Sequence, residues 1–142
     1  MYSVARRAAD AYAEVGVETG VACADPHKLI LMLFDGTLAA IANARVAMAR
    51  REISAKGSAI GKAIAIIDGG LKSSLDVEAG GELAQRLSGL YDYMLRQLVT
   101  ANLRNETDRL DEVSRLLNEL RGAWAQIGQP HPDAQAPEVS TK

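Results

Sequence analysis

The 142-residue sequence is poor in the residue types on which most catalytic and metal sites depend. It contains one cysteine, Cys23, and two histidines, His27 and His131. A single cysteine excludes an internal disulfide, and Cys23 has no histidine at the spacing of a nucleophile and its base. The di-metal centres of four-helix bundles need inward-facing Glu-x-x-His pairs, which the sequence does not contain. We therefore expect no metal, no cofactor and no enzyme activity.

The sequence also lacks an excess of either charge and any long apolar run. Its 16 basic and 18 acidic residues give a net charge of -2 and are spread along the chain. This balance gives no basic patch for nucleic acid or acidic lipid. The apolar run Leu29–Phe34 is far shorter than the roughly 20 residues that cross a bilayer, and no segment resembles a signal peptide. We expect a cytoplasmic protein that neither binds nucleic acid nor inserts into a membrane.

The main pattern in the sequence is a helical periodicity of apolar residues, which is clearest between residues 83 and 127. Apolar side chains recur there at steps of three and four, the spacing that places them on one face of a helix. They form two stripes: Leu83, Leu87, Leu90, Met94, Leu98 and Ala101, then Leu110, Val113, Leu117, Leu120, Trp124 and Ile127. Asn105 lies between the stripes, and its short amide tolerates a left-handed backbone and can cap the following helix. So short a corner predicts two helices packed antiparallel.

The first half of the chain predicts two more helices. Asp25 and Pro26 open the first, because an acidic N-cap followed by proline at the first helical position is a strong start signal. This helix is expected to run to about Arg51, with a turn at Gly57 and a second helix from about Ser58.

Two glycine pairs punctuate the middle of the chain. Gly69 and Gly70 should each cost the second helix about 1 kcal/mol relative to alanine, which indicates close helix approach or local softness. The next corner is expected at 76–81, with the pair Gly80-Gly81 at its end.

Together these patterns predict an all-α protein: an antiparallel up-down four-helix bundle with a short N-terminal arm or helix and a disordered C-terminal tail. The arm comprises residues 1–24, which carry few apolar side chains and should dock weakly. The bundle comprises residues 25–127. The tail comprises residues 128–142, whose prolines and polar residues have no core to join.

Some apolar residues lie outside the core stripes and predict a surface for a partner. They are Met32, Ile66, Tyr91, Leu95, Val99 and Leu103. For Tyr91 and Leu95, the wide buried arc of a bundle helix is an equally good explanation. Together, Ile66, Val99 and Leu103 favour a surface on which an amphipathic or disordered chain places apolar anchors.

Several phrases of the sequence closely resemble the FliS family, the flagellar secretion chaperones that serve flagellin. The phrases are Met1-Tyr2, Ala11-Tyr12, residues 25–30 (DPHKLI), 32–36 (MLFDG), 62–64 (KAI), 66–68 (IID), 80–82 (GGE), 90–94 (LYDYM), 101–105 (ANLRN), Ala123-Trp124 and Ile127. The resemblance covers about residues 1–127, and LYDYM with ANLRN is its most specific part. Asp25 stands where the family usually has serine, and Glu106 where it usually has aspartate.

The resemblance implies a helical bundle that binds the disordered C-terminal segment of flagellin. It implies that the segment becomes helical in patches, that premature filament assembly is blocked, and that flagellin is delivered to the type III export gate. It also implies that the N-terminal arm, with Tyr2 and Tyr12, can cover part of an apolar binding groove. The expected partner-binding residues are therefore Tyr2, Tyr12, Met32, Ile66, Tyr91, Leu95, Val99 and Leu103.

Two other classes of protein are compatible with the same pattern. One is a regulatory helical protein that sequesters a transcription factor or an anti-sigma factor, for which the same grooves would serve. The other is a small bundle enzyme, against which the lack of paired acids, bases or metal ligands argues.

Overall fold

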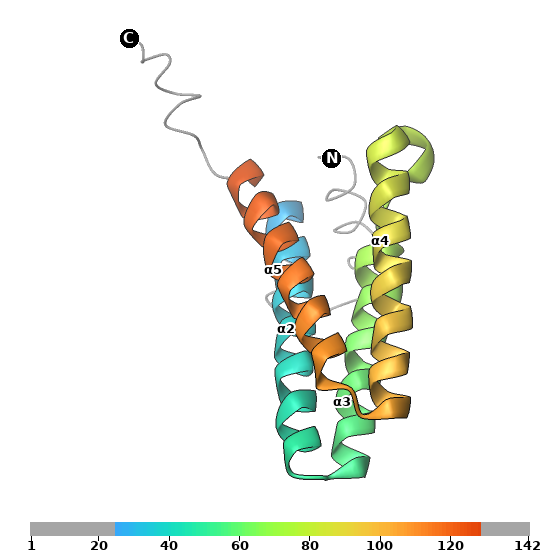
Figure 1. The fold of residues 1–142 in the computed structure, drawn as a ribbon. Coiled ribbons are helices and arrows are strands. Elements are labelled where there is room, and N and C mark those ends of the chain that lie inside the picture. The colour runs from blue at the N-terminus through green and yellow to red at the C-terminus, as the bar shows by residue number, and fades with distance from the viewer. Residues whose placement is uncertain (1–24, 129–142) are drawn as a thin grey trace.

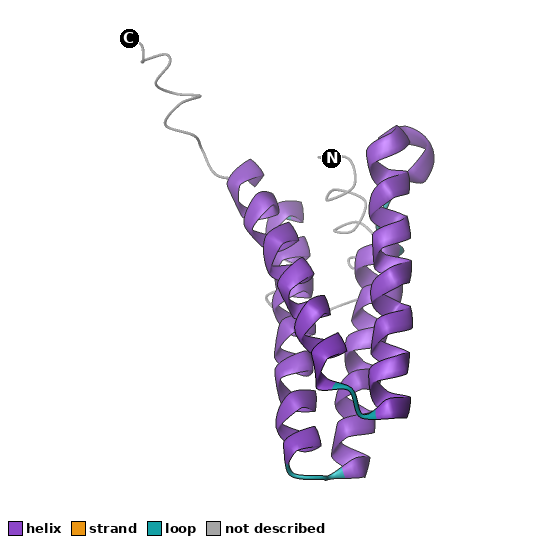
Figure 2. Ribbon diagram, in the orientation of Figure 1, coloured by secondary structure: helices purple, strands orange, loops and turns teal. Residues whose placement is uncertain are grey.

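The computed structural model describes residues 25–128, which form a bundle of four α-helices (Figure 1). The helices are α2 (Pro26–Ala49), α3 (Ile53–Ile66), α4 (Val77–Arg104) and α5 (Thr107–Gly128), and a π-helical segment, η2 (Ile67–Lys72), continues α3. Successive helices run in opposite directions, and residues 25–128 contain no strand (Figure 2). The predicted all-α four-helix bundle is confirmed. The predicted arm and, apart from Gly128, the predicted tail lie outside the described residues.

The start of α2 agrees with its sequence signals. The Asp25 carboxylate accepts a hydrogen bond from the backbone N–H of Lys28 at 2.8 Å, and Pro26 occupies the first turn. The cap therefore satisfies one of the free donors that every helix N-terminus carries.

The turn between α2 and α3 contradicts the prediction that placed it at Gly57. Arg51 takes a left-handed conformation with φ 57°, and its N–H donates to the carbonyl of Met48 at 3.1 Å. The N–H of Glu52 donates to the carbonyl of Ala47 at 2.9 Å, which completes a Schellman motif. Gly57 instead lies inside α3. The prediction missed the turn because an arginine, Arg51, occupies the left-handed position at which glycine is the usual signal.

The segment between α3 and α4 is irregular over the predicted glycine pairs. Gly69 and Gly70 both lie in η2, where hydrogen bonds run from each residue to the fifth residue along. The Asp76 carboxylate then accepts from the N–H of Ala79 at 3.1 Å and caps the first turn of α4. Gly81 breaks this helix with φ 62° and ψ -142°, a conformation open to glycine. The corner predicted at 76–81 is thus a capped single turn that ends in a kink.

The corner between α4 and α5 forms at Asn105, as predicted. Asn105 is left-handed, with φ 56° and ψ 45°, and the next N–H, that of Glu106, donates to the carbonyl of Ala101 at 3.2 Å. The ammonium of Lys56, a buried residue of α3, donates to the side-chain oxygen of Asn105 at 2.5 Å and to the carbonyl of Asn102 at 3.0 Å. The corner is therefore anchored to α3.

The core follows the predicted stripes near that corner but not along their whole length. Met94, Leu98 and Leu117 are fully buried between the helices. Leu83 at the far end of one stripe is 50% exposed, and Ile127 at the far end of the other is 39% exposed. Their assignment to the core was wrong, because α4 and α5 diverge with distance from their corner (Figure 1).

Within residues 25–128, one helix, α2, has the length and composition of a membrane span, with a mean hydropathy of 1.5 over its most apolar 18-residue window. Core helices of soluble bundles have the same composition, since they are apolar on several sides. The buried side chains of α2 include Leu29, Phe34 and Ile41, which pack in the bundle core. The packing accounts for the apolar composition.

Candidate functional site

An apolar groove of about 190 Å³ opens at the end of the bundle where α4 and α5 lie apart. It is lined by Ile30 and Phe34 of α2, Leu71, Ser74 and Leu75 of the segment after α3, Leu83, Leu87 and Tyr91 of α4, and Leu120, Ala123, Trp124 and Ile127 of α5. None of these described lining residues is charged. Catalytic pockets bring several polar groups together, whereas this lining suits the apolar side chains of another chain.

One ion pair joins α5 to α2, and another joins α4 to η2. Asp111 of α5 pairs with Arg45 of α2 at 3.0 Å, while Lys72 of η2 pairs with Asp92 of α4 at 2.7 Å. These pairs are partly exposed, so each adds little to the stability of the bundle. The groove lies between the two helix pairs that they define.

A reciprocal contact between His27 and Trp124 builds one wall of the groove. The indole N–H of Trp124 donates to the carbonyl of His27 at 3.0 Å, and Nε2 of His27 donates to the carbonyl of Trp124. The two rings are stacked, with centroids 5.2 Å apart and an interplanar angle of 9°. Trp124 is thereby fixed against the first turn of α2 while its ring also lines the groove.

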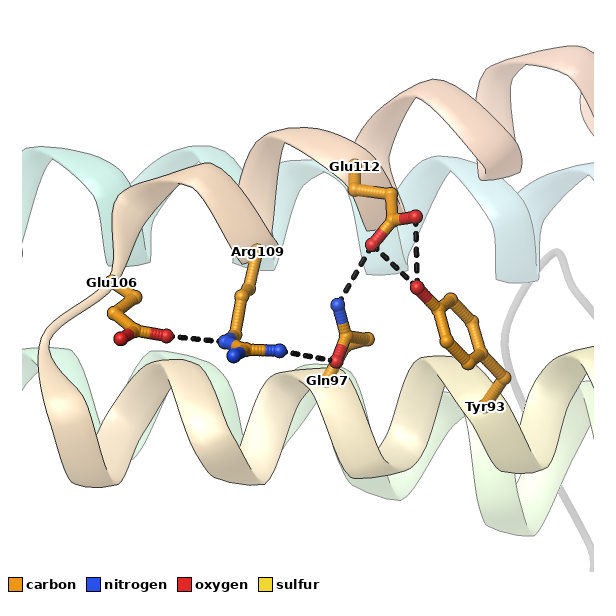
Figure 3. Close-up of polar contacts among 5 residues, drawn as sticks. All are labelled: Tyr93, Gln97, Glu106, Arg109 and Glu112. Carbon is orange, nitrogen blue, oxygen red and sulfur yellow. Dashed lines mark hydrogen bonds and ion pairs between the residues drawn. The ribbon is translucent and has the colours of Figure 1, made fainter.

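A polar network holds α4 and α5 together between the groove and their corner (Figure 3). The carboxylate of Glu112 accepts hydrogen bonds from the hydroxyl of Tyr93 at 2.8 Å and the amide of Gln97 at 2.7 Å. Arg109 donates to the side-chain oxygen of Gln97 at 2.7 Å and also to Glu106. The network uses side chains of both helices, so it fixes their separation where the groove begins.

The same contacts shift the proton affinities of the network. The hydrogen bonds from Tyr93 and Gln97 lower the pKa of Glu112, because they stabilise its charged form. The hydrogen bond to Glu112 raises the pKa of Tyr93, because it stabilises the neutral phenol. Glu112 is thus a structural carboxylate that links α4 and α5.

The predicted partner-binding residues lie in different places. Tyr91 lines the groove and is buried. The exposed residues Met32 on α2 and Val99 and Leu103 on α4 do not line it, and Leu95 packs partly buried against the core. Ile66 is half-buried beside Gly36, since its Cδ1 lies 3.4 Å from where a Cβ on Gly36 would be. Tyr2 and Tyr12 lie outside the described residues.

Most groove residues were predicted as core rather than as a binding site. Leu83, Leu87, Leu120 and Ile127 continue the core stripes without any change of spacing. Periodicity shows which face of a helix is apolar but not what covers that face. The local sequence feature nearest to the groove is Gly81, which kinks α4 two residues before the groove residue Leu83.

The part of the chain between residues 25 and 128 shows no cluster of histidine, cysteine, aspartate or glutamate that could hold a metal ion. A second cavity, of about 340 Å³, lies at the other end of the bundle. Its lining mixes apolar residues such as Met48 with the polar groups of Lys56, Asn105 and Thr107. Because Lys56 already donates to two oxygens of the corner, this cavity is part of the structural anchor described above.

Comparison with known proteins gives consistent results along most of the chain. A family model described as "Flagellar protein FliS" matches residues 8–131. The flagellar secretion chaperone FliS of Salmonella typhimurium is 53% identical over 117 residues, which are 82% of this chain and 87% of that protein. The flagellar secretion chaperone FliSB of Pseudomonas aeruginosa is 51% identical over 120 residues, or 84% and 94% of the two chains. The flagellar secretion chaperone FliS of Escherichia coli is 43% identical over 120 residues, which are 84% of this chain and 88% of that protein.

Proposed function

Since the chain belongs to the FliS family of flagellar secretion chaperones, we propose that it binds the disordered C-terminal segment of flagellin in the cytoplasm. Bound in this way, the segment is kept from polymerising prematurely, and flagellin is delivered to the flagellar type III export gate. The family consists of chaperones rather than enzymes, in agreement with the sequence.

The observation that carries this proposal is the uncharged apolar groove between α4 and α5. A disordered segment that orders on binding loses several kcal/mol of conformational free energy, which burial of apolar area must offset. Full burial of one leucine or phenylalanine side chain contributes about 1.5–3 kcal/mol. The groove offers such burial on several walls at once, so an amphipathic helix of the client is a suitable occupant.

The exposed apolar residues outside the groove extend the proposed contact. Val99 is 46% exposed and Leu103, one helical turn later, is 77% exposed. A client that continues along α4 beyond the groove would cover both, and Met32 offers a further anchor on α2. Tyr2 and Tyr12 complete the proposed set, as residues of an arm that yields its place when the client binds.

Calorimetric titration with a C-terminal flagellin fragment tests the groove through a matched pair of variants. Leu83 lines the groove, whereas Val46 on α2 does not, and both side chains are 50% exposed. Leu83→Asp should weaken binding at least about tenfold, because no described lining residue is a cation that could pair with a carboxylate. Val46→Asp introduces the same charge at the same exposure and should leave the affinity unchanged.

The thermodynamics of the parent protein provide a second readout. Apolar burial requires a clearly negative heat-capacity change, and affinity should fall only slightly between low and moderate salt. Equal affinities of the two variants, with a steep salt dependence, would point to a charge-led contact elsewhere. A fragment that fails to bind the parent would contradict the proposal, and binding of a transcription or anti-sigma factor would then favour the regulatory alternative.

A further inference from the structure

Tyr91 is a buried residue whose hydroxyl has no hydrogen-bond partner among the described residues. The residue is 4% exposed and lines the groove between α4 and α5. Buried tyrosine hydroxyls usually find a partner, and a buried donor without one costs about 1–3 kcal/mol. Tyr93, which is two residues away in the same helix, shows the usual arrangement, since its hydroxyl donates to Glu112 at 2.8 Å.

The ionisation of the two tyrosines reflects this difference. Burial alone raises the pKa of Tyr91, whereas the pKa of Tyr93 is raised chiefly by its hydrogen bond to Glu112. Tyr91 therefore stays protonated at neutral pH and remains a hydrogen-bond donor. Phenylalanine would fill the same space without the cost of the hydroxyl, so packing gives no reason for a tyrosine.

We infer that the Tyr91 hydroxyl is the polar recognition point of the groove and donates a hydrogen bond to a neutral carbonyl oxygen of the bound client segment. This inference rests on the proposed function, in which the groove holds an apolar face of the client. The apolar walls contribute affinity, and the hydroxyl contributes specificity, because it fixes the register at which the client lies in the groove.

The lining determines the kind of acceptor. A client carboxylate would lose its water at a site where no described lining residue is charged, which costs far more than one hydrogen bond returns. A neutral carbonyl avoids that cost. In a helical client, the main-chain carbonyls of the last turn are free to accept, and the side-chain carbonyls of asparagine and glutamine are free anywhere. The client is therefore expected to end a helical stretch, or to place such an amide, against Tyr91.

Replacement of Tyr91 by phenylalanine tests the inference in the full chain, with Tyr93→Phe as the matched control. Tyr91→Phe should leave the thermal midpoint of the free protein unchanged or raised, because no hydrogen bond within residues 25–128 is lost. It should lower the affinity for the flagellin fragment about threefold to tenfold, which corresponds to the loss of one neutral hydrogen bond. Tyr93→Phe is the control for stability and should lower the thermal midpoint, since its hydroxyl bonds within the protein.

A pair of small probes tests the same point without flagellin. Acetophenone and α-methylstyrene have nearly the same shape, but only acetophenone carries a carbonyl oxygen, and apolar cavities of about 150 Å³ bind ligands of benzene size. Binding is followed by the NMR shifts of the leucine methyl groups that line the groove. Tyr91→Phe should lower the affinity for acetophenone about threefold to tenfold and leave the affinity for α-methylstyrene unchanged.

The outcomes separate the inference from the proposed function. A lower thermal midpoint for Tyr91→Phe with unchanged client affinity would overturn the inference, because the hydroxyl would then be paired within the protein. Equal effects of Tyr91→Phe on both probes would also overturn it. If flagellin fails to bind the parent while the carbonyl preference depends on Tyr91, the recognition point stands and the identity of the client is wrong.

Discussion

Trp124 in the last turns of α5 and His27 in the first turn of α2 bind each other in both directions, although they are 97 positions apart in the chain. Each donates from its ring to the main-chain carbonyl of the other, and the rings stack. The contact fixes the end of α5 that has already diverged from α4. The groove can therefore stay open on one side without leaving α5 unsupported.

Trp124→Phe should remove this support in part. The variant keeps an aromatic ring against His27 but loses the N–H that donates at 3.0 Å, and it fills less space. Loss of the hydrogen bond and of packing should lower the free energy of unfolding by about 1–3 kcal/mol. Urea unfolding followed by circular dichroism measures this change. An unchanged midpoint would show that the ring N–H does not bond to His27 in solution.

Stability should fall at both ends of the pH range because of the Tyr93–Glu112 pair. The pKa of Glu112 is lowered in the folded protein, so its contribution is complete above the unfolded value of 4.5 and is lost as pH falls further. The pKa of Tyr93 is raised, so its contribution is complete below the unfolded value of 10.0 and is lost as pH rises further. Thermal midpoints measured against pH should show both losses.

Glu112→Gln and Tyr93→Phe separate the two limbs of that profile. The glutamine variant should be less stable at neutral pH. Its thermal midpoint should also depend less on pH below 4.5, because it lacks the carboxyl group whose pKa is lowered in the folded protein. The thermal midpoint of the phenylalanine variant should depend less on pH above 10.0, because it lacks the phenol whose pKa is raised in the folded protein. An acid limb that is equally steep in the parent and in Glu112→Gln would assign the acid sensitivity to other carboxylates.

Lys56→Met should loosen the corner between α4 and α5. The buried ammonium donates to Asn102 and Asn105, and the loss of hydrogen bonds from a charged donor should cost about 1.5–3 kcal/mol. Lys62→Met is the matched control, since Lys62 is an exposed residue of the same helix. Both variants are compared by chemical unfolding. Equal stabilities would mean that the corner keeps its geometry without the lysine.

Two aspartate substitutions should separate the exposed surface of α4 from the packing between α2 and α3. Val99→Asp should weaken the complex with the flagellin fragment by more than about 1 kcal/mol and leave the helicity of the free protein intact, because Val99 is exposed. Ile66→Asp should also lower the thermal midpoint of the free protein, because Ile66 packs beside Gly36. Circular dichroism and calorimetry distinguish the two effects. Normal binding by Val99→Asp would restrict the client to the groove.

Several features of the fold follow from local sequence alone. Asp25 and Pro26 start α2 because a cap and a fixed φ act within a few residues, and Asn105 forms the corner because its side chain tolerates a left-handed backbone. Apolar steps of three and four likewise identify the inner faces of α4 and α5, since the period of a helix does not depend on its neighbours. These signals were enough to predict four helices.

The apolar groove depends on the tertiary structure. Leu83 and Ile127 continue their stripes without a break, yet both are exposed because α4 and α5 separate before reaching them. The sequence period records which side of each helix is apolar, whereas the angle between two helices depends on side chains from all four. The His27–Trp124 contact and the polar network around Glu112 set that angle through residues distant in the chain. The same dependence on distant neighbours leaves Tyr91 buried without a partner among the described residues, a property that no local pattern could reveal.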